Sequence, residues 1–429
     1  MSEAPVDRET REQAFKLEVE ANLKRNYAAN FVHGMLGLTG FRLLYAPTLM
    51  PAYIHLLTGS AALVGLGQAL LQFGAVLSPI IGASRIEHRP RILPYAIRVG
   101  SLMRVQILGL AVSAWLLSGL PLLIATMLFL FLLGVFTGMQ RVVFQMVIAK
   151  VIPIDRRGRL QGWRNLAGGG IAAGLAYFAG HVLIERNVLG NGYATTFMLA
   201  FVLTSLGLLV LQFFMREPDA AQVRAQKPVA ERVREFPALL ADQDYRWFII
   251  AQGLAIAGRI AAPFYVLFAS QQLGVELNGA LIGLLSLAFL GADTLSNLLW
   301  GNLGDRYGYR ITFMFAVATW IAALVLMLLA RTEALVVISF CGLGAASSGY
   351  LMSAGTMVLE FGETYDIPMR LALSTTVEGA ISAVVPLIGG VIVYTLGYAT
   401  LAYVAVVLLS ASLLILLAKV REPRRRGLP

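Results

Sequence analysis

Long runs of apolar residues, separated by short polar gaps, occupy most of the chain between residues 27 and 419. A helix that crosses a membrane needs about 20 mostly apolar residues. Twelve runs reach this length, so the pattern predicts twelve membrane-spanning helices. Several runs exceed the minimum, and we expect bends at Pro47, Pro263 and Pro386. The predicted spans are 27–55, 60–83, 92–118, 120–149, 160–184, 193–215, 246–272, 279–303, 310–330, 333–359, 370–396 and 398–419.

The composition supports a membrane protein and excludes an ordinary soluble domain. Of the 429 residues, 58% are hydrophobic and 14% are charged, whereas soluble domains carry roughly 25% charged residues. The predicted fold class is therefore an all-α integral membrane protein. Cys341 is the only cysteine, which excludes an internal disulfide and a cysteine-rich metal site.

The distribution of basic residues predicts the orientation of the chain in the membrane. Lys and Arg concentrate in the two terminal segments and in the gaps that follow even-numbered spans, and only Arg186 and Arg331 lie in gaps after odd-numbered spans. Cytoplasmic loops carry such an excess of positive charge. We therefore expect both termini in the cytoplasm, and the net charge of +10 reflects topology and not nucleic-acid binding.

The longest and most charged gap between spans divides the chain into halves of six spans. Within it, Val233, Phe236, Leu239 and Leu240 recur at helical spacing beside basic residues, which favours a short helix on the membrane surface over a solvated linker. The predicted organisation is an N-terminal segment (1–26), a six-helix bundle (27–215), a linker (216–245), a second six-helix bundle (246–419) and a basic tail (420–429).

The two halves contain related residues in the same order. Shifts of 211 to 218 positions place Arg42 on Arg259, Glu87 on Asp305 and Arg159 on Arg370. A proline follows the first two arginines, at Pro47 and Pro263. Each match is weak, but three matches in chain order at similar shifts indicate an internal repeat of six helices.

Residues 301–310, between the eighth and ninth spans, read G-x-L-x-D-R-x-G-x-R. This segment resembles the loop signature of the major facilitator superfamily of membrane transporters. The resemblance implies two pseudo-symmetric six-helix bundles and a conformational latch, in which Asp305 lies beside the N-terminal end of the fifth span, near 160–164. Gly301 is expected to allow close helix packing. The predicted latch residues are Gly301, Asp305, Arg306, Gly308 and Arg310, with Glu87 in the degenerate first copy.

Charged side chains inside the spans are the candidate site residues. A charge in the middle of a bilayer costs at least about 2.5–3.5 kcal/mol, so it normally faces protein or water. In the superfamily, spans one, four, seven and ten line a central cavity. If the chain follows that plan, Arg42, Arg141 and Arg259 converge there, and the pair Arg42 and Arg259 resembles the paired arginines of organophosphate:phosphate antiporters.

The guanidinium fork suits a carboxylate or phosphate because it donates two hydrogen bonds and stays charged. Tyr45 and Tyr265 follow two of these arginines and could add hydroxyl donors. The alternative is that the arginines form structural pairs, or gating pairs in one conformation, with acids such as Asp293 and Glu378. Each acid is a candidate for proton coupling and for a permanent ion pair, because desolvation raises the pKa of a carboxylate and a nearby arginine lowers it. For Glu378 the structural role is favoured.

The sequence predicts secondary active transport of a small organic solute, anionic or amphiphilic, by alternating access. A proton-coupled multidrug or cation exporter is the alternative within transport, and a membrane scaffold or assembly factor is the alternative outside it. No phosphate-binding loop for ATP and no catalytic or metal-binding set is found, so we expect neither an enzyme nor a cofactor. The expected partners are the substrate, membrane lipids and protons, for a monomer in a bacterial inner membrane.

Overall fold

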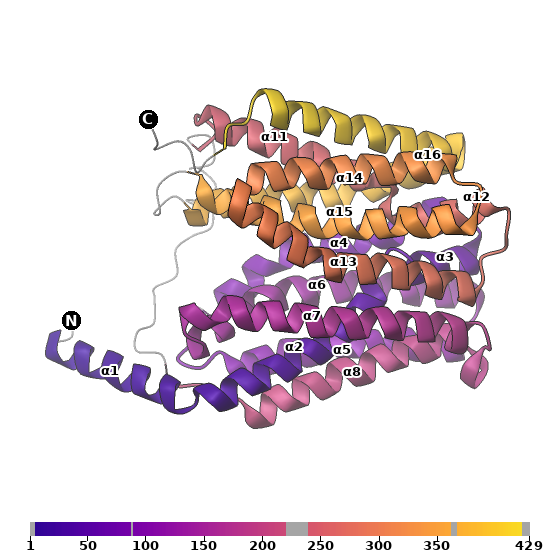
Figure 1. Ribbon diagram of the computed structural model, residues 1–429. Coiled ribbons are helices and arrows are strands. Elements are labelled where there is room, and N and C mark those ends of the chain that lie inside the picture. Colours follow the sequence, from indigo (N-terminus) through magenta and orange to yellow (C-terminus); the bar gives the residue numbers. More distant parts are fainter. Residues whose placement is uncertain (1–4, 87–88, 220–238, 362–366, 423–429) are drawn as a thin grey trace. The chain divides into compact units, whose positions relative to one another are not determined.

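The computed structural model describes residues 5–86, 89–219, 239–361 and 367–422. Throughout these residues every regular element is a helix (Figure 1). Nine of the described helices are long and apolar enough to cross a membrane by length and composition. Large apolar side chains remain exposed on them, including Leu116 at 75% and Tyr394 at 78%. Lipid tails cover such side chains without the cost that water would impose.

The helices follow the order of the predicted spans, and their ends agree within a few residues. The first six spans correspond to α2 (Leu23–Tyr45) with α3 (Leu49–Thr58), α4 (Ala61–Ile86), α5 (Leu93–Leu116), α6 (Gly119–Val151), α7 (Ile154–Phe178) with η1 (Ala179–Ile184), and α8 (Gly192–Phe214). The last six correspond to α11 (Gln243–Gly258) with η3 (Arg259–Phe264) and α12 (Tyr265–Leu273), α13 (Gly279–Tyr307), α14 (Tyr309–Leu329), α15 (Glu333–Met357) with η4 (Val358–Glu360), and both spans of α16 (Ile367–Ala418).

Two short elements lie outside these spans. Helix α1 (Pro5–Ala21) precedes the first span, and η2 (Val188–Gly190) connects the fifth and sixth. Helix α16 contains two spans because the chain remains helical on both sides of Gly397, whose φ of 83° only glycine adopts readily. The prediction of an all-α membrane protein is thereby confirmed, and the order of its helices agrees with twelve spans.

Two of the three predicted bends are breaks in the helix. The first span ends as an α-helix at Tyr45 and restarts at Leu49, on either side of Pro47. The seventh span changes at Arg259 into a short 3-10 helix that contains Pro263. Proline has no N–H to donate to the carbonyl four residues earlier. At Pro386 the helix continues, so proline is tolerated there without a break.

Contacts between Cα atoms divide the chain into two compact units. Unit 1 comprises Met1–Leu43, Phe73–Ala172 and Ala194–Lys227. Unit 2 comprises Leu44–Gln72, Ala173–Tyr193 and Pro228–Pro429. The second halves of the first and fifth spans and the beginning of the second span therefore pack with the last six spans. The division into two bundles of six helices remains a prediction.

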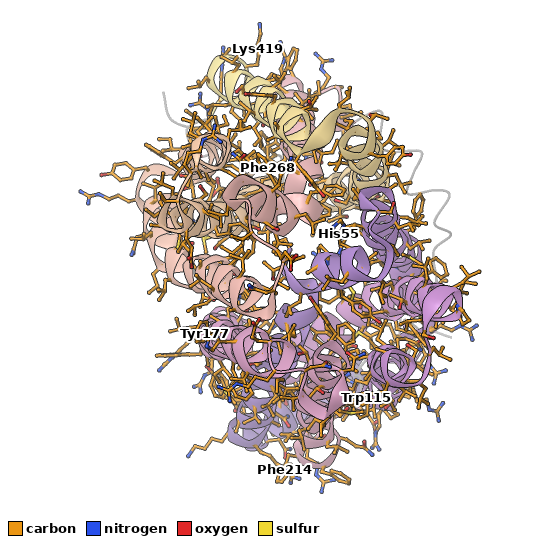
Figure 2. All side chains as sticks on the ribbon, turned by 90° about the vertical axis from the view of Figure 1, so that its right-hand side faces the viewer. His55, Trp115, Tyr177, Phe214, Phe268 and Lys419 are labelled. Carbon is orange, nitrogen blue, oxygen red and sulfur yellow. The ribbon has the colours of Figure 1, made fainter. Side chains whose placement is uncertain are left out.

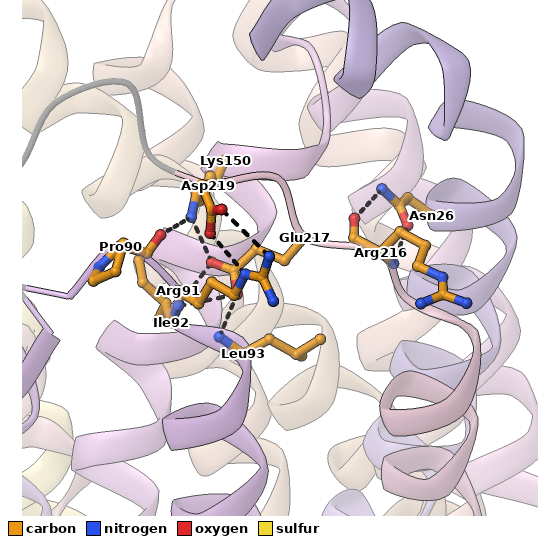
Figure 3. Close-up of polar contacts among 9 residues, drawn as sticks. All are labelled: Asn26, Pro90, Arg91, Ile92, Leu93, Lys150, Arg216, Glu217 and Asp219. Carbon is orange, nitrogen blue, oxygen red and sulfur yellow. Dashed lines mark hydrogen bonds and ion pairs between the residues drawn. The ribbon is translucent and has the colours of Figure 1, made fainter.

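Unit 1 has an apolar core where α5, α6 and α8 meet, with Val143, Val147 and Leu211 fully buried. A polar cluster closes one end of this core (Figure 3). The Glu217 carboxylate accepts hydrogen bonds from the backbone N–H groups of Ile92 and Leu93, at 2.7–3.0 Å. These N–H groups have no partner within the helix, so Glu217 caps α5.

Further contacts fix the same chain segment to unit 1 (Figure 3). Lys150 forms an ion pair with Glu217 at 2.8 Å, and Arg91 forms one with Asp219 at 2.7 Å. The Asn26 amide also binds the backbone of Arg216 through both its donor and its acceptor, each at 2.8 Å. The beginning of the predicted linker is therefore held against the helix ends of this unit.

Unit 2 joins its two early segments to the last six spans through close backbone contacts. A β-carbon added at Gly180 would collide with the backbone of Gly283, and one added at Gly65 would collide with the carbonyl oxygen of Pro386. The Thr48 and Ser286 hydroxyls form a buried hydrogen bond of 2.6 Å. Helices α3 and α12 also make contact, and Figure 2 shows His55 of α3 and Phe268 of α12 on neighbouring parts of this unit.

Most of the predicted surface helix in the linker lies outside the described residues, which resume at Leu239. Glu87 lies outside them as well. Both therefore stay predictions.

Candidate functional site

The break in the seventh span places a charged side chain where the helix stops being regular. The α-helical part ends at Gly258, and Arg259 begins the 3-10 turn. Since Pro263 cannot donate to the carbonyl of Arg259, the α-helical hydrogen-bond pattern is replaced here by 3-10 pairing between residues three apart. Transporters bind substrates and ions at such interrupted helices, where backbone groups are released from the helix.

A cavity of about 250 Å³ lies beside this break, entirely within unit 2. Its apolar lining includes Pro47 from the corresponding break in the first span, together with Phe289 and Trp320. Besides Tyr265 and Trp320, six of its lining residues carry polar or charged groups. They are Tyr45, Gln68, Gln72, Arg259, Ser347 and Ser382. The cavity therefore combines one cation, neutral hydrogen-bonding groups and aromatic walls.

The Arg259 guanidinium makes no hydrogen bond or ion pair with any side chain or carbonyl that the structure describes. Its side chain is partly buried. The described part of the cavity lining contains no carboxylate. A partly desolvated arginine with five free donors is ready to receive an anion.

The two predicted tyrosines both line this cavity. The Tyr265 hydroxyl accepts a hydrogen bond of 2.9 Å from the indole N–H of Trp320, and both side chains are 2% exposed. This bond fixes the Tyr265 ring in the wall, while its hydroxyl proton stays available for donation. Tyr45 is more exposed, at 38%, and lies at the end of α2.

The other two predicted arginines belong to unit 1. Arg42 lies in the last turn of α2 and is partly buried. Arg141 lies on α6 and is exposed. Contacts within a unit therefore bring together Arg259, Tyr45 and Tyr265, whereas the convergence of all three arginines remains a prediction.

The two predicted proton carriers lie on α13 and α16. Glu378 on α16 and Arg259 both interact electrostatically with the buried Tyr350. Asp293 lies midway along α13 and is partly buried, and its backbone carbonyl accepts a hydrogen bond of 2.7 Å from Asn297. Neither carboxylate lines the cavity, and among the described residues no group of three or more His, Cys, Asp or Glu could hold a metal ion.

The loop with the signature sequence forms a compact turn. Helix α13 ends at Tyr307, and Gly308 takes a φ of 97° before α14 begins at Tyr309. The Tyr309 hydroxyl donates to the Asp305 carboxylate at 3.2 Å. Arg306 lies over the Tyr307 ring, 5.3 Å from its centre. The turn thus fixes the side chain that the latch prediction singles out.

Gly301 does not have the close neighbour that the sequence predicts. A β-carbon there would meet no atom within 4 Å among the described residues. The tight position is Gly304, where a β-carbon would collide with the Tyr309 ring. Glycine is therefore required at position 304, where the Tyr309 side chain packs against the backbone.

Arg310 anchors this turn to the last span. Its guanidinium donates to the carbonyl of Leu416 at 2.9 and 3.0 Å and to that of Leu417 at 3.1 Å. These carbonyls belong to the last turn of α16, whose acceptors have no partner within the helix. A β-carbon at Gly308 would also collide with the Glu422 carboxylate. Arg310 thus acts within unit 2, as a cap of the twelfth span.

Four polar residues of the cavity were not predicted from the sequence. Gln68 and Gln72 lie four positions apart on α4, which places them on one face of the helix. Ser347 and Ser382 come from α15 and α16. The spacing of the two glutamines within an apolar span was the one signal that could have identified them.

Comparisons with known proteins identify the fold. Residues 247–429 match the model of the Major Facilitator Superfamily. Solved structures that resemble the chain include the D-xylose-proton symporter, with a TM-score of 0.73, 13% identity, and coverage of 95% of this chain and 100% of that one. The nucleoside transporter NupG has a TM-score of 0.67, 14% identity and coverage of 91% and 97%.

A third similar structure is a bacterial homologue of the human lysosomal transporter Spinster, in an inward-facing and occupied conformation. Its TM-score is 0.64 at 14% identity, with coverage of 92% of this chain and 96% of that one. No curated protein sequence matches the chain. At these identities the solved structures establish the fold alone.

Proposed function

The chain belongs to the major facilitator superfamily, and we propose that it is a secondary active transporter for a small organic anion or amphiphile. The observation that carries the proposal is Arg259. Its guanidinium lines a cavity at a broken transmembrane helix and has no counter-ion among the described residues. Transport in general is supported by the similar structures, which include a nucleoside transporter and a D-xylose-proton symporter.

The energy of a membrane-embedded charge supports an anionic ligand. A cation in a span is costly unless it is paired or solvated. A bound carboxylate or phosphate would give Arg259 two short, charge-assisted hydrogen bonds. Gln68, Gln72 and the serines can bind the neutral polar groups of the same ligand. Such bonds add specificity, because a ligand without these groups leaves buried donors unpaired.

The pseudo-symmetric Arg42, together with Arg141, is proposed to complete the anion site in a conformation that brings the two halves together. Arg42 and Arg259 each precede a helix break at a proline, at Pro47 and Pro263. Two facing arginines repel each other strongly at low dielectric. An anion between them removes that repulsion, which would couple binding to the approach of the halves.

Alternating access is proposed to use the close contacts of unit 2 as a gate on the outer side. The predicted topology places the loops at 184–192 and 274–278 outside the cell. There, Glu185 accepts a hydrogen bond of 3.0 Å from the backbone N–H of Ala280 at the beginning of α13. The backbones of Gly180 and Gly283 also pack without intervening side chains. These contacts must separate when the cavity opens outward.

On the cytoplasmic side, Asp305 is proposed to bind the N-terminal end of the fifth span when that side closes. Helix N-termini attract carboxylates by about 0.3–1 kcal/mol. Proton coupling through Glu378 or Asp293 is the second part of the proposal. For Glu378 it is supported by the nearness of this carboxylate and of Arg259 to the same buried side chain, Tyr350.

The proposed location is a bacterial inner membrane, with both termini cytoplasmic and a monomer as the functional form. Single cysteines at Lys16 and Ser118, in a Cys341→Ala background, test the topology with a membrane-impermeant thiol reagent. Both positions are exposed. We expect labelling from opposite sides of the membrane, and labelling from the same side would contradict the positive-inside assignment.

Thermal unfolding of the purified protein with matched ligand pairs tests the anion site. Each carboxylate or phosphate is compared with its neutral amide or ester, because ligands that bind the native state raise its melting temperature. We expect stabilisation by a subset of the anions, loss of it in Arg259→Gln, and no effect of the neutral partners. Equal effects of neutral and charged partners would contradict an anion site. Substrate-dependent flux in proteoliposomes then separates a transporter from a scaffold.

A further inference from the structure

The neutral polar side chains of the Arg259 cavity have no hydrogen-bond partners within the described part of the chain. Gln68 and Gln72 on α4 and Ser382 on α16 line the cavity and are partly buried, and none of them makes a side-chain hydrogen bond to a described group. The same is true of Ser347 on α15, which is 8% exposed. Most buried polar side chains in proteins are paired, so four unpaired ones in one cavity indicate groups that a ligand pairs.

Glutamines elsewhere in unit 2 show what a structural role looks like. The Gln252 carboxamide oxygen accepts a hydrogen bond of 2.8 Å from Ser374, and both side chains are 2% exposed. The Gln272 amide donates to the carbonyls of Met327 and Leu328, each at 2.9 Å. These carboxamides join neighbouring helices. Those of the cavity lining have no such contact among the described residues and face a space that a ligand can occupy.

The polar groups of the cavity come from four different parts of unit 2. Gln68 and Gln72 lie one turn apart on α4, so both carboxamides are on one face of that helix. Ser347, Ser382 and Arg259 face the same cavity from α15, α16 and η3. A carboxamide offers two donor hydrogens and an acceptor oxygen, and a hydroxyl both donates and accepts. A ligand hydroxyl complements either group, so this set suits a ligand with several hydroxyls.

The size of the cavity favours a compact ligand. Its volume of about 250 Å³ is below the roughly 300–1,000 Å³ of pockets that hold drug-sized molecules. Phe289 and Trp320 form aromatic walls, and the hydrogen bond to Tyr265 fixes the indole ring. These walls can pack against the C–H groups of a short carbon chain or ring while its hydroxyls reach the carboxamides.

We infer that the cavity binds a small polyhydroxylated anion, with its carboxylate or phosphate at Arg259 and its hydroxyl groups on Gln68, Gln72 and the two serines. The inference rests on the proposed anion site and narrows its ligand to hydroxylated anions, as opposed to amphiphiles with an alkyl tail. An alkyl chain in the same place would desolvate the carboxamides and hydroxyls without giving them partners, which lowers affinity. Rejection of the analogue without hydroxyls is therefore the property that distinguishes this class.

Isothermal titration calorimetry of the full-length wild-type protein tests this inference with probes that differ in their hydroxyl groups or their charge. The carboxylate series is gluconate, hexanoate and the neutral polyol sorbitol. The phosphate series is glycerol phosphate, propyl phosphate and neutral glycerol. In one of the two series we expect the hydroxylated anion to bind at least about tenfold more tightly than its analogue without hydroxyls, and the neutral polyol to bind most weakly. The series that shows this order distinguishes a carboxylate ligand from a phosphate ligand.

Variants of the two glutamines locate the preference in the cavity. Gln68→Leu and Gln72→Leu should each reduce it to less than about threefold, by weakening the hydroxylated probe more than its analogue. Gln271→Leu is the matched control, because Gln271 on α12 is exposed and does not line the cavity. It should retain the full preference, and a loss as large as that of the cavity variants would contradict the inference.

The same titrations separate failure of the inference from failure of the anion site. If the two anions of each series bind wild type equally, or the analogue without hydroxyls binds more tightly, while Arg259→Gln weakens both, the inference is wrong and the anion site stands. If Arg259→Gln leaves the affinity of both anions unchanged, or if no anion of either series binds wild type, the proposed anion site is wrong as well.

Discussion

Arg104 and Arg259 are both arginines inside membrane spans, and their surroundings differ in every respect that decides function. Arg104 in unit 1 is 2% exposed. Its Nε donates to the carbonyl of Thr204 and its Nη1 to that of Gly100, each at 2.7 Å, and the guanidinium lies over the Phe41 ring. Only its Nη2 lacks a partner among the described residues.

Arg259 lines a cavity and has no such partners in the described part of unit 2. Arg104 connects α5 to α8, and its guanidinium already donates hydrogen bonds to two backbone carbonyls. An anion would therefore gain few further hydrogen bonds from it. The comparison shows that depth in the membrane does not identify a functional charge. The useful criterion is how many donors the protein leaves unused and whether they face an accessible space.

The largest expected effect is the loss of transport in Arg259→Gln. Charge-assisted hydrogen bonds contribute about 1.5–3 kcal/mol each, so we expect flux of the identified anion to fall by about 100-fold or more. Arg259→Lys retains the charge but loses the planar guanidinium, so its flux should lie between that of wild type and that of Arg259→Gln. The measurement is uptake into proteoliposomes. Normal flux in Arg259→Gln would show that Arg259 does not bind the transported anion.

Arg104→Ala is expected to affect stability and not binding. It removes a buried side chain and leaves the Thr204 carbonyl without its donor, which should lower the free energy of unfolding by about 2–4 kcal/mol. The melting temperature of the purified variant measures this change. An unchanged anion affinity in the folded fraction supports a structural role, whereas an affinity loss as large as that of Arg259→Gln would break the comparison.

Glu217→Gln tests a second structural charge of unit 1. The carboxylate caps α5 and pairs with Lys150, and the amide can still accept a hydrogen bond but loses the charge. We expect a destabilisation of about 1–2 kcal/mol, seen as a lower melting temperature, with unchanged anion binding. An affinity change without a stability change would contradict the assignment.

The smallest effect should come from the exposed pair of Arg91 and Asp219. The hydrogen bond from Arg91 holds the pKa of the Asp219 carboxyl below its usual value of 3.8. A carboxyl whose pKa is lower in the folded state than in the unfolded state stabilises the fold at any pH above its unfolded pKa. This contribution disappears as the pH falls through the folded-state pKa. The melting temperature of wild type should therefore drop slightly more than that of Arg91→Gln below pH 3.8. Parallel curves would show that the pair contributes nothing.

The order and the ends of the helices could be predicted from the sequence, but the side of each helix that faces the cavity could not. Span order follows from apolar run length, and the breaks at Pro47 and Pro263 follow from the missing proline N–H. Which side of an apolar helix faces a cavity is harder, because lipid and protein interior are both apolar and leave little amphipathic pattern. Gln68 and Gln72 were missed for this reason.

Other features of unit 2 depend on contacts between segments far apart in the sequence. The packing of Gly180 against Gly283 joins the fifth and eighth spans, and no local pattern announces such a pairing. The return of the Tyr309 ring over Gly304 likewise depends on the turn geometry at Gly308. Local propensity specifies where a helix ends, whereas the partner of each helix face is a property of the whole fold.

The most direct test of the account is the affinity of one anionic ligand for Arg259→Gln and Arg104→Gln, measured side by side by isothermal titration calorimetry. Both substitutions remove one positive charge from a membrane span, so a general electrostatic effect would weaken both equally. We predict a loss of about 100-fold or more for Arg259→Gln and less than about twofold for Arg104→Gln. Equal losses, or a loss confined to Arg104→Gln, would contradict the assignment of Arg259 as the anion-binding residue.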